Sequence, residues 1–313
     1  MGMKSSWMGA LCLALAASLW GGTYVVSKAV MNWVDPSALI WLRYALGALA
    51  LGAVGLVRRV NWRMSARHVG TVVAIGLVGY ALSIWAQFVG TQWSTAQMGA
   101  VITSGTPAFM VIFARVLLGE AITWRRAASV ILATLGVIVM IGLGHQAHSR
   151  EAWGGLILLV AAVTWGLQSV LVKRVPSEYS SIVVTAYAML VALAVMTPVS
   201  WPHMPRLEAL LGHTWVWLGI LYLGVLSTAG AFLLWNEGLR RMPAGAGGVY
   251  FFLQPLVGTA LGWIVLGENV TPSFWFGSLL ILGGVALVIR EPESSERSVR
   301  WASSLSKDGS QDS

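Results

Sequence analysis

Charged residues are scarce in this chain, and cysteine is almost absent. Only 10% of the 313 residues are charged while 57% are hydrophobic, and the single cysteine is Cys12. One cysteine excludes an intrachain disulfide and a metal site built from several thiolates. So little charge argues against a water-soluble fold, because the apolar surface exceeds what one core can bury. Lipid is therefore the expected solvent for most of the chain.

Motifs of enzymes and metal sites are also missing. The sequence has no His-Glu-x-x-His, no Gly-x-Ser-x-Gly and no Gly-rich phosphate loop followed by lysine. We therefore expect no catalytic residue, no metal and no cofactor. The net charge of +8 comes from short basic clusters between apolar runs, so we expect no nucleic-acid partner. A membrane-embedded enzyme acting on a lipid stays open, because such enzymes can lack the motifs of soluble ones.

Apolar runs of helical length recur ten times along the chain. Each can cross a hydrocarbon core at about 1.5 Å per residue, and backbone groups in lipid must be hydrogen-bonded within their own segment. The first run stays uncharged up to Ser27, so we expect an uncleaved helix there rather than a signal peptide. The predicted spans are residues 7–30, 36–57, 69–91, 96–118, 126–143, 153–173, 181–201, 214–236, 244–266 and 273–290.

The positive charges between these spans predict the orientation. With the amino terminus inside, the inner segments carry fifteen Lys and Arg residues and the outer loops only Arg150 and Arg206. Basic residues in short loops are retained on the cytoplasmic side, so we expect both termini to be cytoplasmic. Residues 291–313 are rich in Ser, Glu and Arg, and we expect a disordered tail.

The two halves of the chain resemble each other in sequence. At an offset of 145 residues Trp20-Gly21 matches Trp165-Gly166, and at an offset of 148 Pro107 matches Pro255. Leu-Gly-Glu at 118–120 likewise matches 266–268. Each half holds an odd number of spans, so the second copy must enter the membrane from the opposite side. We expect an all-α integral membrane protein of ten transmembrane helices, arranged as two inverted five-helix repeats.

These motifs, in this order and twice over, resemble the EamA-type family of the drug/metabolite transporter superfamily. The resemblance covers about residues 7 to 290 and implies a first repeat at 1–143, an outer linker at 144–152 and a second repeat at 153–290. It also implies a multi-pass carrier of the bacterial inner membrane, with a central cavity formed mainly by helices 1, 3, 4, 6, 8 and 9. Fold analogy supports a transporter better than it supports any one substrate.

We therefore expect a secondary transporter that exports a small polar metabolite, such as an amino acid, by alternating access. The partners are then the substrate and the lipid bilayer, and the sequence leaves open whether the chain is a monomer or a homodimer. A drug or cation efflux carrier is a further alternative. No Asp or Glu lies in the middle of the first span, which argues against proton-coupled exchange of cationic drugs by that route.

Polar and aromatic residues inside the apolar spans are the candidates for substrate binding, because a permeant exchanges its hydration for protein contacts. Several follow helical spacing, such as Trp20, Tyr24 and Ser27, and so share one face of their span. Packing between helices is the alternative role for each. The predicted substrate-binding residues are Trp20, Tyr24, Tyr80, Ser83, Gln87, Thr103, Trp165, Gln168, Trp235, Asn236, Tyr250 and Gln254.

Prolines and charges inside or near the spans complete the prediction. Pro107 and Pro255 each remove a backbone donor halfway along a span, so we expect two kinks that contribute to gating or only to packing. Arg43 lies about 10 Å into the second span, where it either extends to the surface or ties that helix to another. Glu120 and Glu268 follow the ends of spans and are expected to cap helices or tether loops.

Overall fold

The protein is helical throughout the part of the chain that its structure describes. The structure, a computed structural model, describes residues 3–93, 102–103, 105–141, 149–204, 213–266 and 272–289. Within these ranges a few side chains, including those of Tyr24 and Lys28, lie outside the description. The predicted tail at 291–313, Glu268 and most of the predicted linker at 144–152 also lie outside the described residues.

The helices follow one another through short connections. Three stretches are 3-10 helix (η2, η3 and η5) and two are π-helix (η1 and η4). In chain order the elements are α1 (Met3–Val30), α2 (Pro36–Val57), α3 (Ala66–Ala74), η1 (Ile75–Ser83), α4 (Ile84–Trp93), α6 (Thr106–Leu118), α7 (Trp124–Ile141), α8 (Ser149–Leu171), η2 (Val172–Arg174), α9 (Ser181–Ser200), η3 (Trp201–His203), α11 (Thr214–Leu221), η4 (Tyr222–Gly230), α12 (Ala231–Arg241), α13 (Ala244–Gly248), η5 (Val249–Phe252), α14 (Leu253–Leu266) and α15 (Pro272–Ile289).

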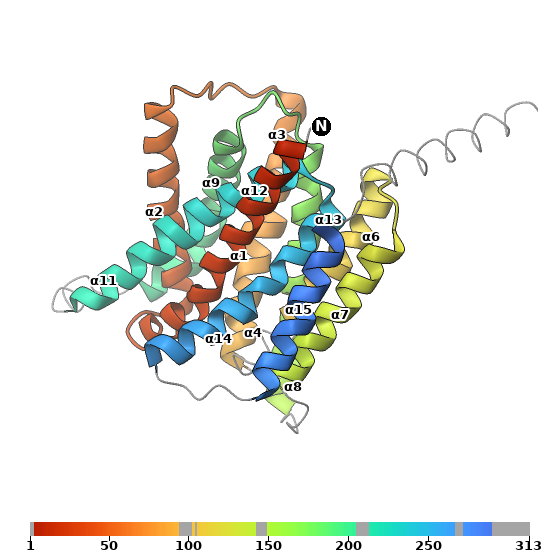
Figure 1. Cartoon of the computed structure of the whole chain (residues 1–313). Coiled ribbons are helices and arrows are strands. Elements are labelled where there is room, and N and C mark those ends of the chain that lie inside the picture. The colour runs from red at the N-terminus through yellow and green to blue at the C-terminus, as the bar shows by residue number, and fades with distance from the viewer. Residues whose placement is uncertain are drawn as a thin grey trace, which may run out of the picture.

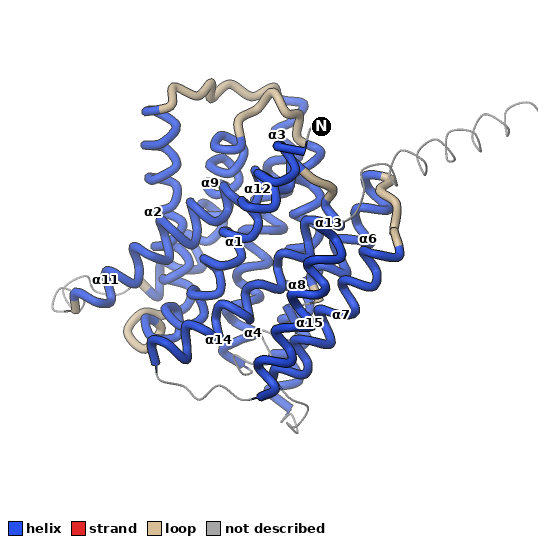
Figure 2. The backbone as a smooth tube through the Cα atoms, in the orientation of Figure 1, coloured by secondary structure: helices blue, strands red, loops and turns tan. Residues whose placement is uncertain are grey.

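The helices form one bundle, with α1 running diagonally through its middle (Figure 1). Helix α1 packs against α12 and α14, while α2 packs against α9 and η4. Helices α7 and α15 lie side by side at one edge of the bundle, and α2 and α11 lie toward the opposite edge. Loops connect the helices only at their ends (Figure 2). This arrangement places the centre of the bundle between α1, α4, α8 and α12.

Six helical stretches of the described residues are long and apolar enough to cross a membrane. They confirm that the described part of the chain is an all-α membrane-protein fold, and each overlaps one of the predicted spans. Helix α8 begins at Ser149, four residues earlier than predicted, and the third stretch extends over 66–93. The six stretches are 7–27, 36–57, 66–93, 153–174, 181–203 and 214–241.

Two predicted spans do not form one regular α-helix. The fourth was predicted at 96–118, but α6 begins at Thr106 after a turn at Gly105. The ninth was predicted at 244–266, and it is divided into α13, the 3-10 turn η5 and α14. Pro107 lies in the first turn of α6, where its missing N–H costs no hydrogen bond. Pro255 is the third residue of α14, directly after the 3-10 turn η5, so both prolines lie near the start of an α-helix.

The third and eighth spans each contain a nine-residue π-helical segment, η1 and η4. A π-helix widens the turn and disturbs the regular ladder of backbone hydrogen bonds. The sixth residue of each segment uses its carbonyl oxygen to bind another helix. Tyr80 O accepts a hydrogen bond from the Tyr44 hydroxyl at 2.5 Å, and Ser227 O accepts one from Trp20 Nε1 at 2.9 Å. Apolar periodicity alone does not reveal such segments.

Glycines set the closest helix contacts, and they do so at matching places in the two halves. A Cβ on Gly136 of α7 would lie 2.7 Å from Gly277 O, and one on Gly284 of α15 would lie 2.9 Å from Ser129 O. Residues 277 and 129 are themselves 148 positions apart, as are 284 and 136. The absence of a side chain therefore lets α7 and α15 approach until their backbones nearly touch.

Candidate functional site

A cavity lies in the middle of the bundle, between α1, α2, α4, α6, α8, α12 and the start of α14. It holds about 690 Å³ of empty space when the part that is open to solvent is included. Along α1 it extends from Trp20 to Met31, a rise of about 16 Å. The cavity therefore reaches the end of the bundle at which α1 terminates.

Half of the predicted substrate-binding residues line this cavity. They come from five of the expected spans and include both members of the matching tryptophan pair. The residues that the structure brings together here are Trp20, Ser83, Gln87, Thr103, Trp165 and Gln254. The side chain of Tyr24 lies outside the described residues.

Other lining residues were not among the predicted binding residues. The largest omission is Arg43, because α2 was not expected to contribute to the cavity. The remaining polar ones share helical spacing with predicted residues, as Thr23 and Ser27 do with Trp20. That periodicity is a signal by which they could have been found. The polar lining residues outside the predicted binding set are Thr23, Ser27, Arg43, Thr91 and Thr106, although Ser27 was already placed on the same face as Trp20.

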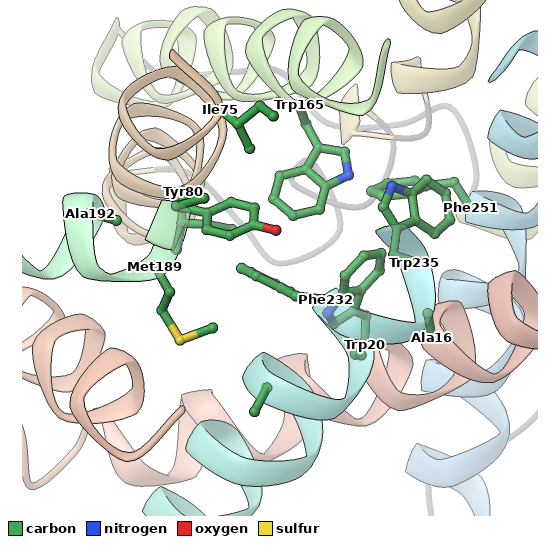
Figure 3. Packing of buried hydrophobic residues seen from close by; sticks show 14 of the residues in the cluster. Ala16, Trp20, Ile75, Tyr80, Trp165, Met189, Ala192, Phe232, Trp235 and Phe251 are labelled. Carbon is green, nitrogen blue, oxygen red and sulfur yellow. The ribbon is translucent and has the colours of Figure 1, made fainter. Parts of the chain in front are cut away.

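Aromatic rings form one end of the cavity. The matching residues Trp20 and Trp165 meet edge to face, with ring centroids 5.3 Å apart. Phe232 lies 5.8 Å from Trp20 and 5.4 Å from Trp165. Figure 3 shows these rings grouped with Tyr80 and Phe251. Such edge-to-face clusters offer a rigid apolar surface to a ligand.

Arg43 is the charged member of the lining and is 2% exposed. Its Nε donates to Thr228 Oγ1 at 2.7 Å, and its Nη2 lies 3.5 Å from Ser227 Oγ. The guanidinium carbon lies 5.6 Å from the centre of the Phe88 ring. Of the two alternatives for this residue, extension to the surface is wrong. Arg43 ties α2 to η4, through hydroxyl groups rather than through backbone carbonyls.

The other five predicted residues with described side chains lie away from the cavity lining. Asn236 Nδ2 donates to the Tyr80 hydroxyl at 2.7 Å and to Thr185 Oγ1 at 2.9 Å. Trp235 Nε1 donates to Ser169 Oγ at 3.1 Å. Helix packing, the alternative role for these residues, is what the structure shows for Tyr80, Trp235 and Asn236. The residues outside the lining are Tyr80, Gln168, Trp235, Asn236 and Tyr250.

Several buried polar atoms of the described residues have no hydrogen-bond partner. They belong to the fourth, sixth, eighth and ninth predicted spans. An unpaired polar group in a dry interior is costly, so each is a point at which a ligand or a conformational change can supply the partner. These atoms are Thr106 Oγ1, Trp165 Nε1, Gln168 Nε2, Asn236 Oδ1 and Tyr250 Oη.

Glu120 forms a largely buried ionic cluster away from the cavity. Gly119 ends α6 in the left-handed conformation, with φ of 67°, which glycine adopts most readily. The Glu120 carboxylate lies 3.2 Å from Lys173 Nζ and 3.6 Å from Arg126 Nη1. It also accepts hydrogen bonds from the backbone N–H groups of Ala244 and Gly245 at the start of α13. The expectation that Glu120 tethers a loop is therefore confirmed.

Comparison with known proteins identifies the family. The sequence pattern of the EamA-like transporter family matches residues 7–142 and 152–290. An uncharacterized transporter of Archaeoglobus fulgidus is 26% identical over 285 residues, covering 90% of this chain and 98% of that protein. A Streptantibioticus cattleyicolor protein named "Probable terminal-alkyne amino-acid exporter" is 25% identical over 285 residues, covering 89% and 92%.

A solved crystal structure shares the fold. It superposes with a TM-score of 0.77 at 22% sequence identity, covering 96% of this chain and 99% of that one. This likeness concerns the fold alone, whereas the family match extends over nearly all of the chain, including every residue of the cavity lining. The chain therefore belongs to the EamA-like transporter family, and it is a multi-pass membrane protein.

Proposed function

We propose that this protein is a secondary transporter that exports a small polar metabolite, such as an amino acid, across the bacterial inner membrane by alternating access. The observation that carries the proposal is the cavity, in which polar groups and aromatic rings converge within otherwise apolar helices. A lipid-facing surface gains nothing from Gln87, Thr103 or Gln254, whereas a small polar solute needs such partners in place of water.

Ten spans in two inverted repeats are part of this proposal. Matching contacts in the two halves support it. Gly90 packs closely on Leu158, and Gly238 packs on Leu13 in the same way. The glycines are 148 positions apart, and the leucines are 145 apart. A two-fold relation between the halves gives such paired contacts and allows one half to rock against the other around a central substrate.

The shape of the cavity supports an outward-facing conformation. With cytoplasmic termini, the carboxyl end of α1 faces outward, and the cavity extends toward that end as far as Met31. The Glu120 cluster joins the loop after α6 to the start of α13, next to the carboxyl end of α12. That end of α12 packs on the amino-terminal part of α1 through Gly238 and Leu13. We therefore place the closed gate of this conformation on the cytoplasmic side.

Gating at Pro107 and Pro255 belongs to the same proposal. Pro107 follows a turn and Pro255 follows a 3-10 segment, and Thr106 and Gln254, each next to one of them, line the cavity. An irregular backbone next to the binding site lets the two parts of a span move independently. The name of the Streptantibioticus cattleyicolor relative, "Probable terminal-alkyne amino-acid exporter", supports the choice of substrate class and direction.

An exporter of cationic drugs is not favoured by the cavity. Its described lining includes the cation Arg43 and no Asp or Glu side chain. A cationic substrate would meet repulsion from Arg43 in a site of low dielectric constant, without a carboxylate to offset it. No feature of the described residues favours a lipid-modifying enzyme.

Transport by purified protein in liposomes tests the proposal. We expect uptake or exchange of at least one member of a panel of radiolabelled amino acids, recovered chemically unchanged. Gln87→Ala and Gln254→Ala should lower the initial rate about tenfold or more, because each removes a polar group from the lining. Leu49→Ala is the control, since Leu49 is 71% exposed on the outside of α2. Normal rates in both glutamine variants would contradict the site assignment.

A further inference from the structure

The guanidinium of Arg43 is only partly satisfied by the protein. Arginine carries five N–H donors in a planar fork. One of them, on Nε, makes a short hydrogen bond to Thr228, and one on Nη2 reaches Ser227 at 3.5 Å, the limit of such a bond. Among the described residues no hydrogen-bond acceptor is recorded for Nη1. Three donors therefore remain on a side chain that lines the cavity.

The two hydroxyl groups that bind the Arg43 guanidinium make further hydrogen bonds within the protein. They therefore fix the position of its Nε side. Thr228 Oγ1 donates to Leu223 O at 2.6 Å, and Ser227 Oγ lies 2.6 Å from Thr23 Oγ1. Both hydroxyls belong to the π-helical segment η4. This chain of hydrogen bonds orients the guanidinium and removes most of its rotational freedom before any ligand arrives.

The positive charge of Arg43 has no counter-charge in the described part of the protein. The ion pairs recorded there involve Glu120 and Glu237, and neither contacts Arg43. Phe88 offers its ring face, and the hydroxyls offer dipoles, but none of these groups is an anion. A cation taken out of water is stable only when paired or well hydrogen-bonded, so the cavity next to Arg43 favours an anion.

The geometry points to a carboxylate as that anion: we propose that Arg43 binds the carboxylate group of the transported substrate. This inference rests on the proposed function and names its substrate class. A planar carboxylate matches the guanidinium fork with two parallel hydrogen bonds. A single cation in the described lining suits one negative charge better than a phosphate dianion. The rings of Trp20, Trp165 and Phe88 line the same cavity and accept the apolar part of the molecule.

Calorimetric titration of the full-length protein in detergent tests this inference. The probes are the twenty common L-amino acids and benzoate, each compared with its primary amide, which keeps the shape and removes the carboxylate charge. We expect at least one acid to bind the wild-type protein ten times or more tighter than its amide. This comparison needs no variant, so it decides the question even if a substitution at Arg43 prevents folding.

Two substitutions locate the preference at Arg43. Arg43→Met should abolish the difference between acid and amide, and Arg43→Lys should keep part of it, because lysine retains the charge without the fork. Arg58→Gln is the matched control, since it removes an exposed positive charge at the carboxyl end of the same helix. That variant should bind the acid as the wild type does.

The results separate this inference from the proposed function. The inference is overturned if no acid of the panel binds, if every acid binds within about threefold of its amide, or if Arg43→Met keeps the preference. If the protein transports amino acids but shows no preference for the acid over its amide, the proposed function is supported and the role of Arg43 is not. Conversely, an acid could bind through Arg43 and never be transported. That result would support the carboxylate site and contradict the transporter proposal.

Discussion

Arg43 and Arg126 are each 2% exposed, but only one of them has a carboxylate beside it. Arg126 donates to Ala121 O at 2.9 Å and lies 3.6 Å from Glu120, in a cluster completed by Lys173. Arg43 has two hydroxyl groups and an aromatic ring. The Glu120 cluster joins three segments of the chain, whereas the surroundings of Arg43 form part of a cavity wall.

This difference separates two uses of a buried positive charge. A buried cation that is paired with a carboxylate of the protein stabilises the fold. Removing either partner leaves the other charge buried without a counter-charge. A cation without a carboxylate, such as Arg43, connects its neighbours only through neutral hydrogen-bond partners and keeps its electrostatic attraction for a ligand. We therefore expect substitutions at the two places to affect different measurements.

The largest expected effect is on stability, at Glu120. Glu120→Ala should lower the free energy of unfolding by about 3–5 kcal/mol, because Arg126 and Lys173 lose their shared carboxylate in a buried setting. Unfolding of the detergent-solubilised protein by titration with a denaturing detergent measures the change. Glu237→Ala is the control. Its pair with Arg241 is about one-third exposed and should be worth about 1 kcal/mol or less. Equal losses in the two variants would contradict the comparison.

An intermediate effect is expected at the matching tryptophans. Trp20 Nε1 donates to Ser227 O, whereas Trp165 Nε1 is buried without a partner. Trp20→Phe should therefore destabilise the protein by about 1–2 kcal/mol more than Trp165→Phe, because only the first change strips the Ser227 carbonyl of its donor. The same unfolding titration compares them. A larger loss at Trp165 would show that the free indole N–H has a structural partner after all.

The smallest stability effect is expected at Arg43, although its variant should lose carboxylate binding. Arg43→Met should change the free energy of unfolding by less than about 1 kcal/mol, because an apolar side chain of similar length replaces a buried and unpaired charge. Thr228 and Ser227 keep their partners Leu223 O and Thr23. A loss of unfolding free energy as large as that of Glu120→Ala would mean that Arg43 mainly stabilises the fold.

Much of the fold follows from the sequence, because long apolar runs in lipid have no alternative to the helix. The positions of six spans are predicted within a few residues. Pro107 and Pro255 mark where the fourth and ninth spans become irregular, but they do not show which form the backbone takes there. The π-segments η1 and η4 are not predicted at all, since apolar residues of the same kind occur in α-helices and π-helices. The local sequence also does not show which backbone carbonyl, far away in the chain, accepts the hydrogen bond of Trp20 or Tyr44.

The cavity is predictable only in part, for a related reason. Trp20, Gln87, Trp165 and Gln254 stand out as polar or aromatic residues at mid-depth, and they do line it. Tyr80 and Asn236 stand out equally in the sequence but bind each other. Arg43 is conspicuous as a charge within a span, yet its role depends on Ser227 and Thr228, nearly two hundred residues away. Contacts at such separation arise from the folded arrangement.

The close pairing of α7 with α15 has a practical consequence. No described residue of either helix lines the cavity, and the glycine contacts leave their backbones almost no room to slide. Their outer faces carry Leu135 and Leu279, which are 48% and 68% exposed and therefore accessible to chemical labels. The distance between spin labels at these two positions should stay constant during a transport cycle. Distances from either label to labels on other helices would then report how far those helices move.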